Sequence, residues 1–450
     1  QTDGAMSIPF TSEKNRGEVL HGCLACGDAD QGAAGLGLRA TRSFSRGDII
    51  YRDRPLVVLQ SGWSARAAPA CLNCGMLVGG GLRCLLQRAA AACEGAAGSW
   101  PQLEQSGWLD DEHFALPALS PCSAPDCLAA FCGEACREAQ MASGHHRVLC
   151  RGSGCLTAAQ QDAWVAFCSH ADTHYDTFRL AGLVICKVAG EVLFGQPLAQ
   201  AIERLTRFCS RPWPELAAPG RRQGNRVEKC MALLGESHRL LCDALVGALP
   251  EGLERLLSYE GYSSLVGMLD LVTKDLARPN TLDKRLKEAL DDAPVQLRTE
   301  LGQFGLVWMR ARLDAENEDE DVSEFEGEQG KSAPAADGDA AAGDRQKDLV
   351  EMSRRAAKLP VLPGFEGFGL VEPVALTNHS CDANTDIVPS VYTSDVVASA
   401  TRDIAEGEEL TMSYIDDTKH LHVRRHELLS GYAFLCRCAR CEAEAQLASD

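Results

Sequence analysis

The sequence predicts an α+β protein in which two β-rich segments enclose a cysteine-rich module and a helical region. Three observations support this prediction. Short runs of β-forming residues separated by turns occur at residues 35–59 and again in the last hundred residues. Cysteine and histidine pairs gather between residues 71 and 150. The stretch from 156 to 313 carries apolar residues at helical spacing instead, which predicts a mostly helical region.

The length and composition indicate a globular, soluble protein. A chain of 450 residues that is 45% hydrophobic can bury a substantial core, and its length predicts two or three structural units. No stretch reaches the ~18 unbroken apolar residues that a membrane span needs. The first residues do not show the basic segment followed by an apolar segment that a targeting leader would have. Since the chain begins with Gln1, the question whether a targeting segment precedes it is left open. We expect no membrane partner and a monomer.

The cysteine pattern favours zinc over disulfides. The chain has 21 cysteines, grouped in C-x2-C, C-x3-C and C-x-C-x2-C patterns, and it is too large to need a disulfide scaffold. This pattern predicts a reducing compartment, the nucleus or the cytosol. Within the polar residues 1–30, Cys23 and Cys26 have no further ligands nearby and are interpreted as thiols.

The negative charge is concentrated in one segment. The net charge is −19, and Asp314 to Asp344 contains twelve acidic residues and one lysine. Residues 314–347 are therefore predicted to be an acidic disordered insertion. The rest of the chain is only mildly acidic and has no basic stripe, so we expect no direct nucleic-acid binding. A basic protein substrate is compatible with this balance.

Eight paired residues predict two zinc sites in the cysteine-rich module. Each ion needs four ligands in tetrahedral geometry, and short turns supply two at a time. His145 competes with His146, and spacing favours His146. Clustering of free thiols by chance is the weaker alternative, and Cys84 and Cys93 are not expected to be ligands. The predicted sets are Cys71, Cys74, Cys132 and Cys136 on one ion, and Cys122, Cys127, His146 and Cys150 on the other.

A second set of motifs lies near the end of the chain. The stretch LTNHSCDAN, from Leu376 to Asn384, follows an apolar approach and carries a polar run that a core strand would not. Thirty residues later, GEELTMSYID predicts a strand that ends in Tyr414. One upstream cysteine and three from FLCRCARC complete a third tetrahedral zinc site. Its predicted ligands are Cys381, Cys436, Cys438 and Cys441.

A Gly-x-Gly sequence opens the first β-rich segment. Gly35 and Gly37 flank Leu36, where the backbone must turn tightly or approach a ligand closely. Taken alone, the pattern favours a plain hairpin.

In this order, the motifs resemble the SET-and-MYND group of SET-domain protein lysine methyltransferases. GLGLRATRSFSRGDII is similar to the opening SET strands, residues 71–150 to the inserted MYND zinc module, and LTNHSC and GEELTMSYID to the two catalytic motifs. RRHELLSGYAFLCRCARC is similar to the post-SET segment. The chain also resembles the branch without C-terminal helical repeats and the plant trithorax-related members, whose substrates would be histones or ribosomal proteins.

The resemblance implies a domain organisation for the whole chain. A β-rich SET domain would be interrupted by the zinc module and the helical region and would end in a zinc knuckle. The implied parts are the N-terminal segment 1–30, the first SET part 31–66, the MYND-like module 67–155, the helical region 156–313, the acidic insertion 314–347, the SET catalytic core 348–418 and the post-SET segment 419–450.

The implied reaction is methyl transfer from S-adenosylmethionine to a protein lysine. By the resemblance, Asn378 and His379 hold the cofactor together with backbone groups at Gly35, Leu36 and Gly37. Tyr414 is the implied catalytic residue and also a cofactor contact. Phe434 would pack on the adenine or line the lysine channel, and Tyr432 would set the channel width. For both residues, packing above a zinc knuckle is the alternative.

Three features depart from the family pattern. Ala383 stands where the family has proline, Ala34 and Leu36 stand where polar side chains often face the cofactor, and the interval between the first zinc pairs is long. These departures keep a second interpretation open, an adaptor that binds peptides through its zinc module without catalysis. The presence of Asn378, His379 and Tyr414 together favours the enzyme.

Overall fold

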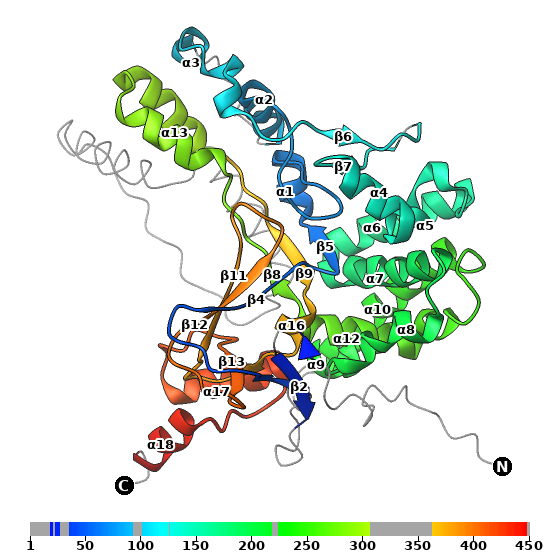
Figure 1. Cartoon of the computed structure of the whole chain (residues 1–450). Helices are drawn as coiled ribbons and strands as arrows, with labels where there is room; N and C mark the ends of the chain where they lie inside the picture. The colour runs from blue at the N-terminus through cyan, green and yellow to red at the C-terminus, as the bar shows by residue number, and fades with distance from the viewer. Residues whose placement is uncertain are drawn as a thin grey trace, which may run out of the picture.

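The computed structural model describes seven stretches of the chain: residues 19–20, 23–27, 36–92, 101–125, 127–217, 224–306 and 362–447. Small β-sheets occupy one half of the molecule, and a group of helices packs beside them (Figure 1). This arrangement confirms the predicted α+β class. Gly35 and the predicted acidic insertion at 314–347 lie outside the described residues.

The β-rich half consists of three small sheets. Their strand orders are β1-β2-β3-β13-β10, β11-β12-β4 and β5-β9-β8. The strands are β1 (Val19–Leu20), β2 (Cys23–Gly27), β3 (Leu36–Ala40), β4 (Ile49–Asp53), β5 (Val57–Gln60), β8 (Lys274–Asp275), β9 (Gly367–Leu370), β10 (Asn378–His379), β11 (Thr385–Pro389), β12 (Val396–Ala400) and β13 (Glu409–Met412).

Strands from the two ends of the chain pair with each other. β3 pairs with β13, β4 with β12 and β5 with β9, all antiparallel. Side chains alternate between buried and partly exposed along β12 and β13, as expected for strands with one face on a core. The cysteine-rich module and the helices are therefore insertions into one β-rich unit.

The cysteine-rich module contains short elements, and its apolar residues belong to two clusters. Most of those between residues 77 and 116, such as Leu82, Leu86 and Phe114, are part of the large core. A second, small cluster consists of buried cysteines with Val78 and Phe131, where metal binding can add the stability that a small core lacks. The elements are α1 (Gly62–Ala67), α2 (Leu82–Ala92), α3 (Pro101–Gln105), η2 (Trp108–Asp110), η3 (Glu112–Phe114), β6 (Ser120–Pro121), β7 (Ala130–Phe131), α4 (Glu134–Ser143), α5 (His146–Leu149) and η4 (Arg151–Ser153).

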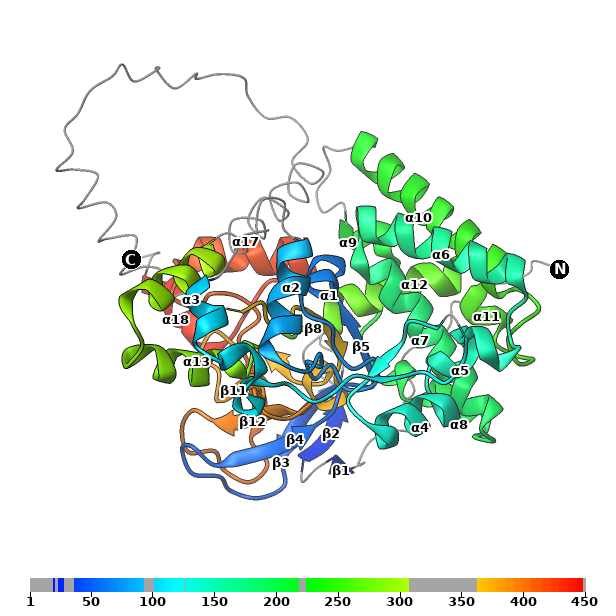
Figure 2. The same ribbon diagram turned by 90° about the horizontal axis from the view of Figure 1, so that it is seen from above.

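The helical region packs around α7, most of which is buried. Viewed from above, α6, α7, α10 and α12 lie together beside the sheets (Figure 2). Residues 295–306 are also helical. The named elements are α6 (Ala158–His174), α7 (Asp176–Leu193), α8 (Leu198–Glu203), η5 (Leu205–Arg207), α9 (Trp213–Ala217), α10 (Gly224–Leu245), α11 (Glu254–Leu257), α12 (Tyr259–Val272) and α13 (Leu282–Asp291).

Local signals and aromatic packing explain these helices. Thr157 forms a capping box with Gln160 at the start of α6. The ring of Phe178 lies 5.1 Å from that of Trp213 and 6.5 Å from that of Tyr262, which joins α7, α9 and α12. β8 interrupts the helices and pairs with β9, so the stretch predicted to be helical also contributes a strand. None of the described helices is long and apolar enough to cross a membrane.

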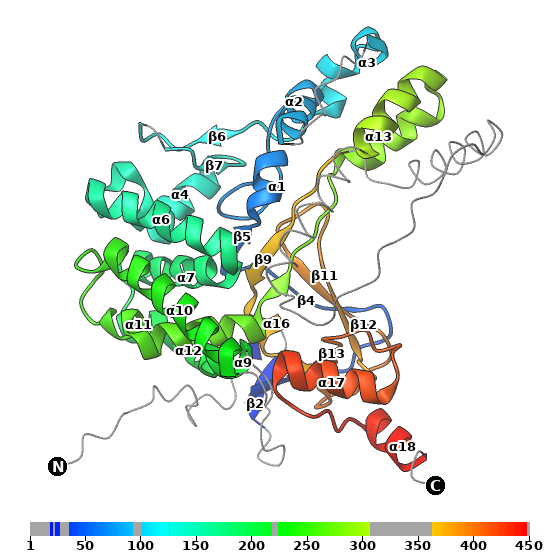
Figure 3. The same cartoon turned by 180° about the vertical axis from the view of Figure 1, so that it is seen from behind.

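The C-terminal helices lie at the β13 end of the sheets. α16 (Glu372–Ala375) leads into β10, and α17 (Leu421–Tyr432) and α18 (Ala439–Leu447) follow β13. Seen from behind, α17 runs beside β13 (Figure 3). Ala433 ends α17 with φ 58°, in the left-handed region that a β-carbon disfavours. This bend directs Tyr432 and Phe434 toward the segment around β10.

Candidate active site and zinc clusters

β10 brings the polar motif beside the strand that leads to Tyr414. Asn378 pairs with Thr411 and His379 with Met412 in a parallel register. The amide N–H of Ser380 donates to the carbonyl oxygen of Met412 at 3.0 Å, which continues the ladder. Two motifs thirty residues apart in sequence therefore form one surface.

The Asn378 side chain lies against Gly37 of β3. Its Nδ2 donates to Oε1 of Glu409 at 2.9 Å. A β-carbon on Gly37 would lie 2.7 Å from Nδ2 of Asn378 and 2.8 Å from Oε1 of Glu409. Gly37 thus sits within a strand, and the close approach of side chains rather than a turn requires glycine there. Leu36 is the neighbouring residue of β3, and it is partly buried.

Asn384 stabilises the turn after Cys381, a role that was not predicted from the sequence. It is 1% exposed, and its Nδ2 donates to the carbonyl of Glu409 at 2.8 Å. Its Oδ1 accepts from the Thr411 N–H at 2.8 Å. The hydroxyl of Thr401 donates to the carbonyl of Ala383 at 2.9 Å. These bonds hold the turn where the family proline is absent, and an asparagine directly before a strand was the available signal.

The His379 imidazole faces protein groups on both sides. Its Nδ1 accepts from the Tyr414 backbone N–H at 3.1 Å, and its Nε2 lies 3.3 Å from Sγ of Cys381. Burial, assisted by the nearby charge of Arg424, lowers the pKa of His379 to about 4. A neutral ring that accepts at Nδ1 carries its proton on Nε2, so it donates toward the Cys381 sulfur. The backbone of His379 remains for a ligand.

Tyr414 is held by a hydroxyl bond to the backbone. Its hydroxyl donates to the carbonyl of Thr377 at 2.8 Å. Thr377 is fully buried, and its own hydroxyl donates to the carbonyl of Pro373 at 2.8 Å, so this acceptor is rigid. Burial, with a smaller contribution from Tyr432, raises the pKa of Tyr414 above its usual value. The hydroxyl therefore stays protonated and fixed in direction.

Tyr432 and Phe434 complete an aromatic group around Tyr414. The Tyr432 ring lies 4.8 Å from the Tyr414 ring, and its hydroxyl donates to the Tyr414 carbonyl at 3.4 Å. The Phe434 ring lies 6.0 Å from the His379 ring. The structure thus brings Asn378, Tyr414 and the two aromatic residues after β13 into one region beside β10.

The twelve predicted metal ligands lie in three groups of four. Within each group the ligand atoms lie within 4.8 Å of one another. Sulfur pairs in each group are separated by 3.5–3.6 Å, close to the ~3.8 Å edge of a tetrahedron with Zn–S bonds of about 2.3 Å. A disulfide would need about 2.05 Å. The donor sets, two of four cysteines and one of three cysteines with a histidine, suit zinc.

The structure distinguishes between the two candidate histidines. Nε2 of His146 lies 3.4 Å from Sγ of Cys122 and 3.6 Å from Sγ of Cys127. His145 is 2% exposed, and neither ring nitrogen has a hydrogen-bond partner. His146 is therefore the histidine in this group. Cys84 is exposed on α2, in none of the groups that the described residues form.

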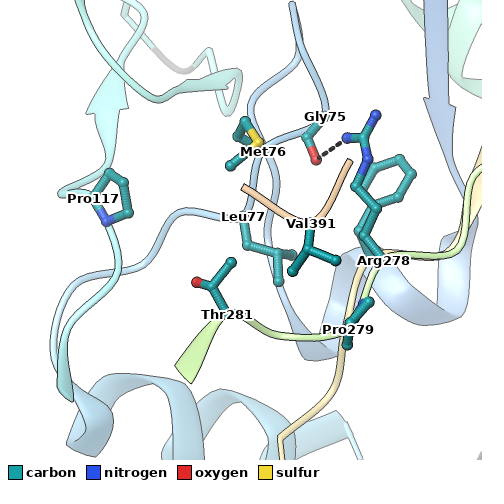
Figure 4. Close-up of a pocket in the computed structure, with 9 residues that line it drawn as sticks. Gly75, Met76, Leu77, Pro117, Arg278, Pro279, Thr281 and Val391 are labelled. Carbon is teal, nitrogen blue, oxygen red and sulfur yellow. Dashed lines mark hydrogen bonds between the residues drawn. The ribbon is translucent and has the colours of Figure 1, made fainter. Parts of the chain in front are cut away.

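Arg278 joins the first cysteine group to the β-rich unit. Its guanidinium is buried and donates to the carbonyls of Cys74 and Gly75, and to that of Ser394 at 3.1 Å (Figure 4). Figure 4 shows it beside a cavity of about 30 Å³ that Met76 also lines. That volume suits one water molecule and is too small for a cofactor.

Comparison with known proteins places a SET domain in this chain. A model of the SET domain family matches residues 272–415. The match begins at the end of α12, takes in β8 and runs to Ile415, next to Tyr414. The matched stretch therefore contains β10, β13 and the turn after Cys381.

The chain is also similar to SET-and-MYND proteins. A SET and MYND domain-containing protein of Dictyostelium discoideum is 40% identical over 84 residues, 19% of this chain and 16% of that protein. The protein-lysine N-trimethyltransferase SMYD5 of Gallus gallus is 24% identical over 439 residues, 92% of this chain and 84% of the relative. The histone-lysine N-methyltransferase SMYD3 of Homo sapiens is 41% identical over 78 residues, 17% of this chain and 18% of that protein. The matches thus span under a fifth of two relatives and most of the third.

Proposed function

We propose that this chain, a SET-domain protein related to the SET-and-MYND proteins, is a protein-lysine N-methyltransferase that uses S-adenosylmethionine. The observation that carries the proposal is the arrangement of β10, which places Asn378 and His379 beside Tyr414 within the matched SET domain. The relatives whose printed names state an activity are lysine methyltransferases.

The chain's own residues fit the cofactor. Gly37 leaves no room for a β-carbon, so β3 approaches Asn378 as closely as a backbone can. We assign the cofactor contacts to the Asn378 amide, to backbone groups of Leu36, Gly37 and His379, and to the rings of Tyr414 and Phe434. The cofactor would supply a methyl group on a sulfonium, which a neutral amine can attack directly.

The reaction requires alignment and a neutral lysine. The lysine nitrogen forms a bond to the methyl carbon while the carbon–sulfur bond breaks, and the resulting ammonium loses a proton to water. Apolar surroundings lower the pKa of an inserted lysine and expose its lone pair. The Tyr414 hydroxyl oxygen and the Thr377 carbonyl, 2.8 Å apart, offer two acceptors that can orient a polarised C–H and the amine.

The aromatic ring of Tyr432 lies where it can form one wall of the lysine channel. Its ring packs against that of Tyr414 at a centroid distance of 4.8 Å, so a lysine that reaches the Tyr414 hydroxyl would pass it. We therefore propose Tyr432 as the residue that sets the channel width. The number of methyl groups would follow from that width.

We propose three structural zinc ions, one in each group of ligands. The first two would stabilise the part of the MYND-like module around its cysteines, where the buried residues other than cysteine are Val78 and Phe131. The third would fasten the segment that carries Tyr432 and Phe434 over β10, because Cys381 follows β10 and the other ligands follow Phe434.

We propose a basic protein as the substrate, with histones first and ribosomal proteins as the alternative. A lysine-rich partner suits the chain's net charge of −19. Such substrates would place the protein in the nucleus or the cytosol, where cysteines stay reduced.

The test is methyl transfer from labelled S-adenosylmethionine to histone and ribosomal protein mixtures. We expect incorporation by the parent and at least a ~10²-fold loss in Tyr414→Phe, since positioned polar groups contribute factors of this size. Tyr392→Phe, at a site 70% exposed, is the matched control and should keep full activity.

Equal incorporation by the parent and Tyr414→Phe would contradict the role of Tyr414. If the parent transferred no methyl groups and S-adenosylmethionine did not raise its melting temperature, the non-catalytic adaptor would be favoured instead.

A further inference from the structure

Arg424 of α17 is buried against the C-terminal cysteine group. Its side chain is 1% exposed. Nε donates to Sγ of Cys381 at 3.3 Å, and Nη2 reaches Sγ of Cys441 at 3.6 Å. The remaining donors bond to the carbonyl of Lys419 at 2.6 Å and to Glu444 at 2.8 Å. One guanidinium therefore contacts two of the four predicted ligands directly.

The charge of Arg424 matches the charge expected in the cluster. Four thiolates around one Zn²⁺ carry a formal charge of about −2, which is costly to bury without compensation. Arginine cannot release its proton in a protein, so it offers a permanent positive charge.

The carboxylate of Glu444 does not fully neutralise the positive charge of Arg424. It is 34% exposed and shares its carboxylate with Arg440, whose Nε lies 2.8 Å from Oε1. Arg440 also donates to the carbonyl of Cys381 at 3.0 Å. The guanidinium of Arg424 therefore remains available to the sulfur atoms.

Cys381 receives N–H donors from two sides. Arg424 approaches with Nε at 3.3 Å, and His379 approaches with Nε2 at 3.3 Å. A thiolate is the better acceptor for two donors, because hydrogen bonds to charged groups are stronger than those to neutral groups. The other ring nitrogen of His379 accepts from the Tyr414 N–H at 3.1 Å. A continuous set of contacts thus joins Arg424 to the candidate active site.

We propose that Arg424 is a positioning residue that holds the sulfur atoms of Cys381 and Cys441 in place and offsets the negative charge of the ligand cluster, and so retains the zinc ion that holds the end of the chain over β10. The proposal rests on the zinc proposed for this cluster. Arg424 contacts neither substrate nor cofactor in this account. Its effect on methyl transfer passes through Cys381 and His379 to the Tyr414 backbone.

Two other arginines, Arg278 at the first cluster and Arg425 at the C-terminal cluster, provide a contrast in the same molecule. Arg278 beside the first cluster bonds to the carbonyls of Cys74 and Gly75 rather than to sulfur. Arg425, next to Arg424 on α17, likewise bonds to the carbonyls of Cys436 and Cys441, at 3.3 and 3.4 Å. Arg425 is therefore a matched control, because it contacts the same cluster from the same helix without contacting sulfur in these bonds.

The experiment compares zinc retention in the full chain and in Arg424→Met, Arg424→Lys and Arg425→Met. Each protein is exposed to a chelator and a thiol-alkylating reagent, and mass spectrometry follows alkylation of each cysteine with time. In Arg424→Met we expect alkylation of Cys436, Cys438 and Cys441 to be about 10- to 100-fold faster, the usual effect of removing a partner of a metal ligand. The cysteines of the other two clusters should change by less than about two-fold, which is within the independence expected of distant sites.

The control variants keep the proposal testable if Arg424→Met fails to fold. Arg424→Lys retains the charge but cannot reach both sulfur atoms as a rigid fork, so we expect an intermediate rate. Arg425→Met should stay near the parent rate. Equal alkylation rates in the parent and both Arg424 variants would overturn the role of Arg424 even if the parent binds three zinc ions. A parent without zinc at this cluster would overturn both this inference and the proposed zinc site, whereas loss of methyl transfer alone would concern only the proposed activity.

Discussion

Gly37→Ala should weaken the binding of S-adenosylmethionine while the protein still folds. The added β-carbon would lie 2.7 Å from Nδ2 of Asn378 and 2.8 Å from Oε1 of Glu409. Ordinary contacts to a β-carbon begin near 3.4 Å, so both side chains would have to move by more than half an ångström. They are joined by a hydrogen bond of 2.9 Å, which that movement would break.

The cost follows from the kind of bond that is lost. A hydrogen bond to a charged carboxylate contributes about 1.5–3 kcal/mol. If the Asn378 amide holds the cofactor, its displacement should weaken binding of S-adenosylmethionine by about 10- to 100-fold, at about 1.4 kcal/mol for each factor of ten. The free energy of unfolding should fall by no more than this hydrogen bond contributes, because alanine otherwise suits a strand at least as well as glycine.

Isothermal titration calorimetry with S-adenosylmethionine measures this effect. Gly235→Ala is the control, since its site in α10 has no atom within 4 Å of the added carbon. That variant should bind the cofactor like the parent and gain about 0.5–1 kcal/mol of stability. If Gly37→Ala bound S-adenosylmethionine within two-fold of the parent, Asn378 and the close approach of β3 would have no part in cofactor binding.

Two further substitutions test the C-terminal segment. Cys436→Ser should remove one of three zinc ions and abolish methyl transfer, because the segment that carries Tyr432 would no longer be held to Cys381. The two MYND-like clusters should keep their zinc ions. Metal analysis that found all three ions, together with normal turnover, would contradict this role. Ala433→Gly should raise the free energy of unfolding by about 1 kcal/mol, since φ 58° at the end of α17 disfavours a β-carbon. Urea denaturation measures that change, and a loss of stability would show that the Ala433 methyl group has a packing role.

The paired cysteines were the part of the site that sequence reasoning predicted most fully. All twelve predicted ligands lie in the three expected groups, because metal-ligand spacing on short turns is a local property. The choice of His146 over His145 needed the packing of α5, which leaves His145 buried away from the sulfur atoms. The domain boundaries, the compartment and the cofactor contacts remain predictions.

Contacts between segments far apart in the chain could not be predicted from the sequence. Asn384 was passed over because its value lies in hydrogen bonds to Glu409 and Thr411 across the sheet. From the sequence, Gly37 was interpreted as part of a tight turn or of a close approach to a ligand, with a hairpin favoured. In the structure, glycine is required there because the side chain of Asn378, far along the chain, lies against it. Arg424 gave no signal at all, since an arginine on a short helix is usually solvated.

The family resemblance supplied the link between the asparagine–histidine motif and Tyr414, while the sequence by itself determined the α+β class and the ligand residues of three predicted metal sites. These follow from period, spacing and residue chemistry, which act over a few residues. Only the tertiary structure decided that β10 lies parallel to β13, that the Tyr414 hydroxyl bonds to the Thr377 carbonyl, and that a buried arginine faces two cysteines. Those relations depend on how segments far apart in the chain pack, and no local pattern encodes them.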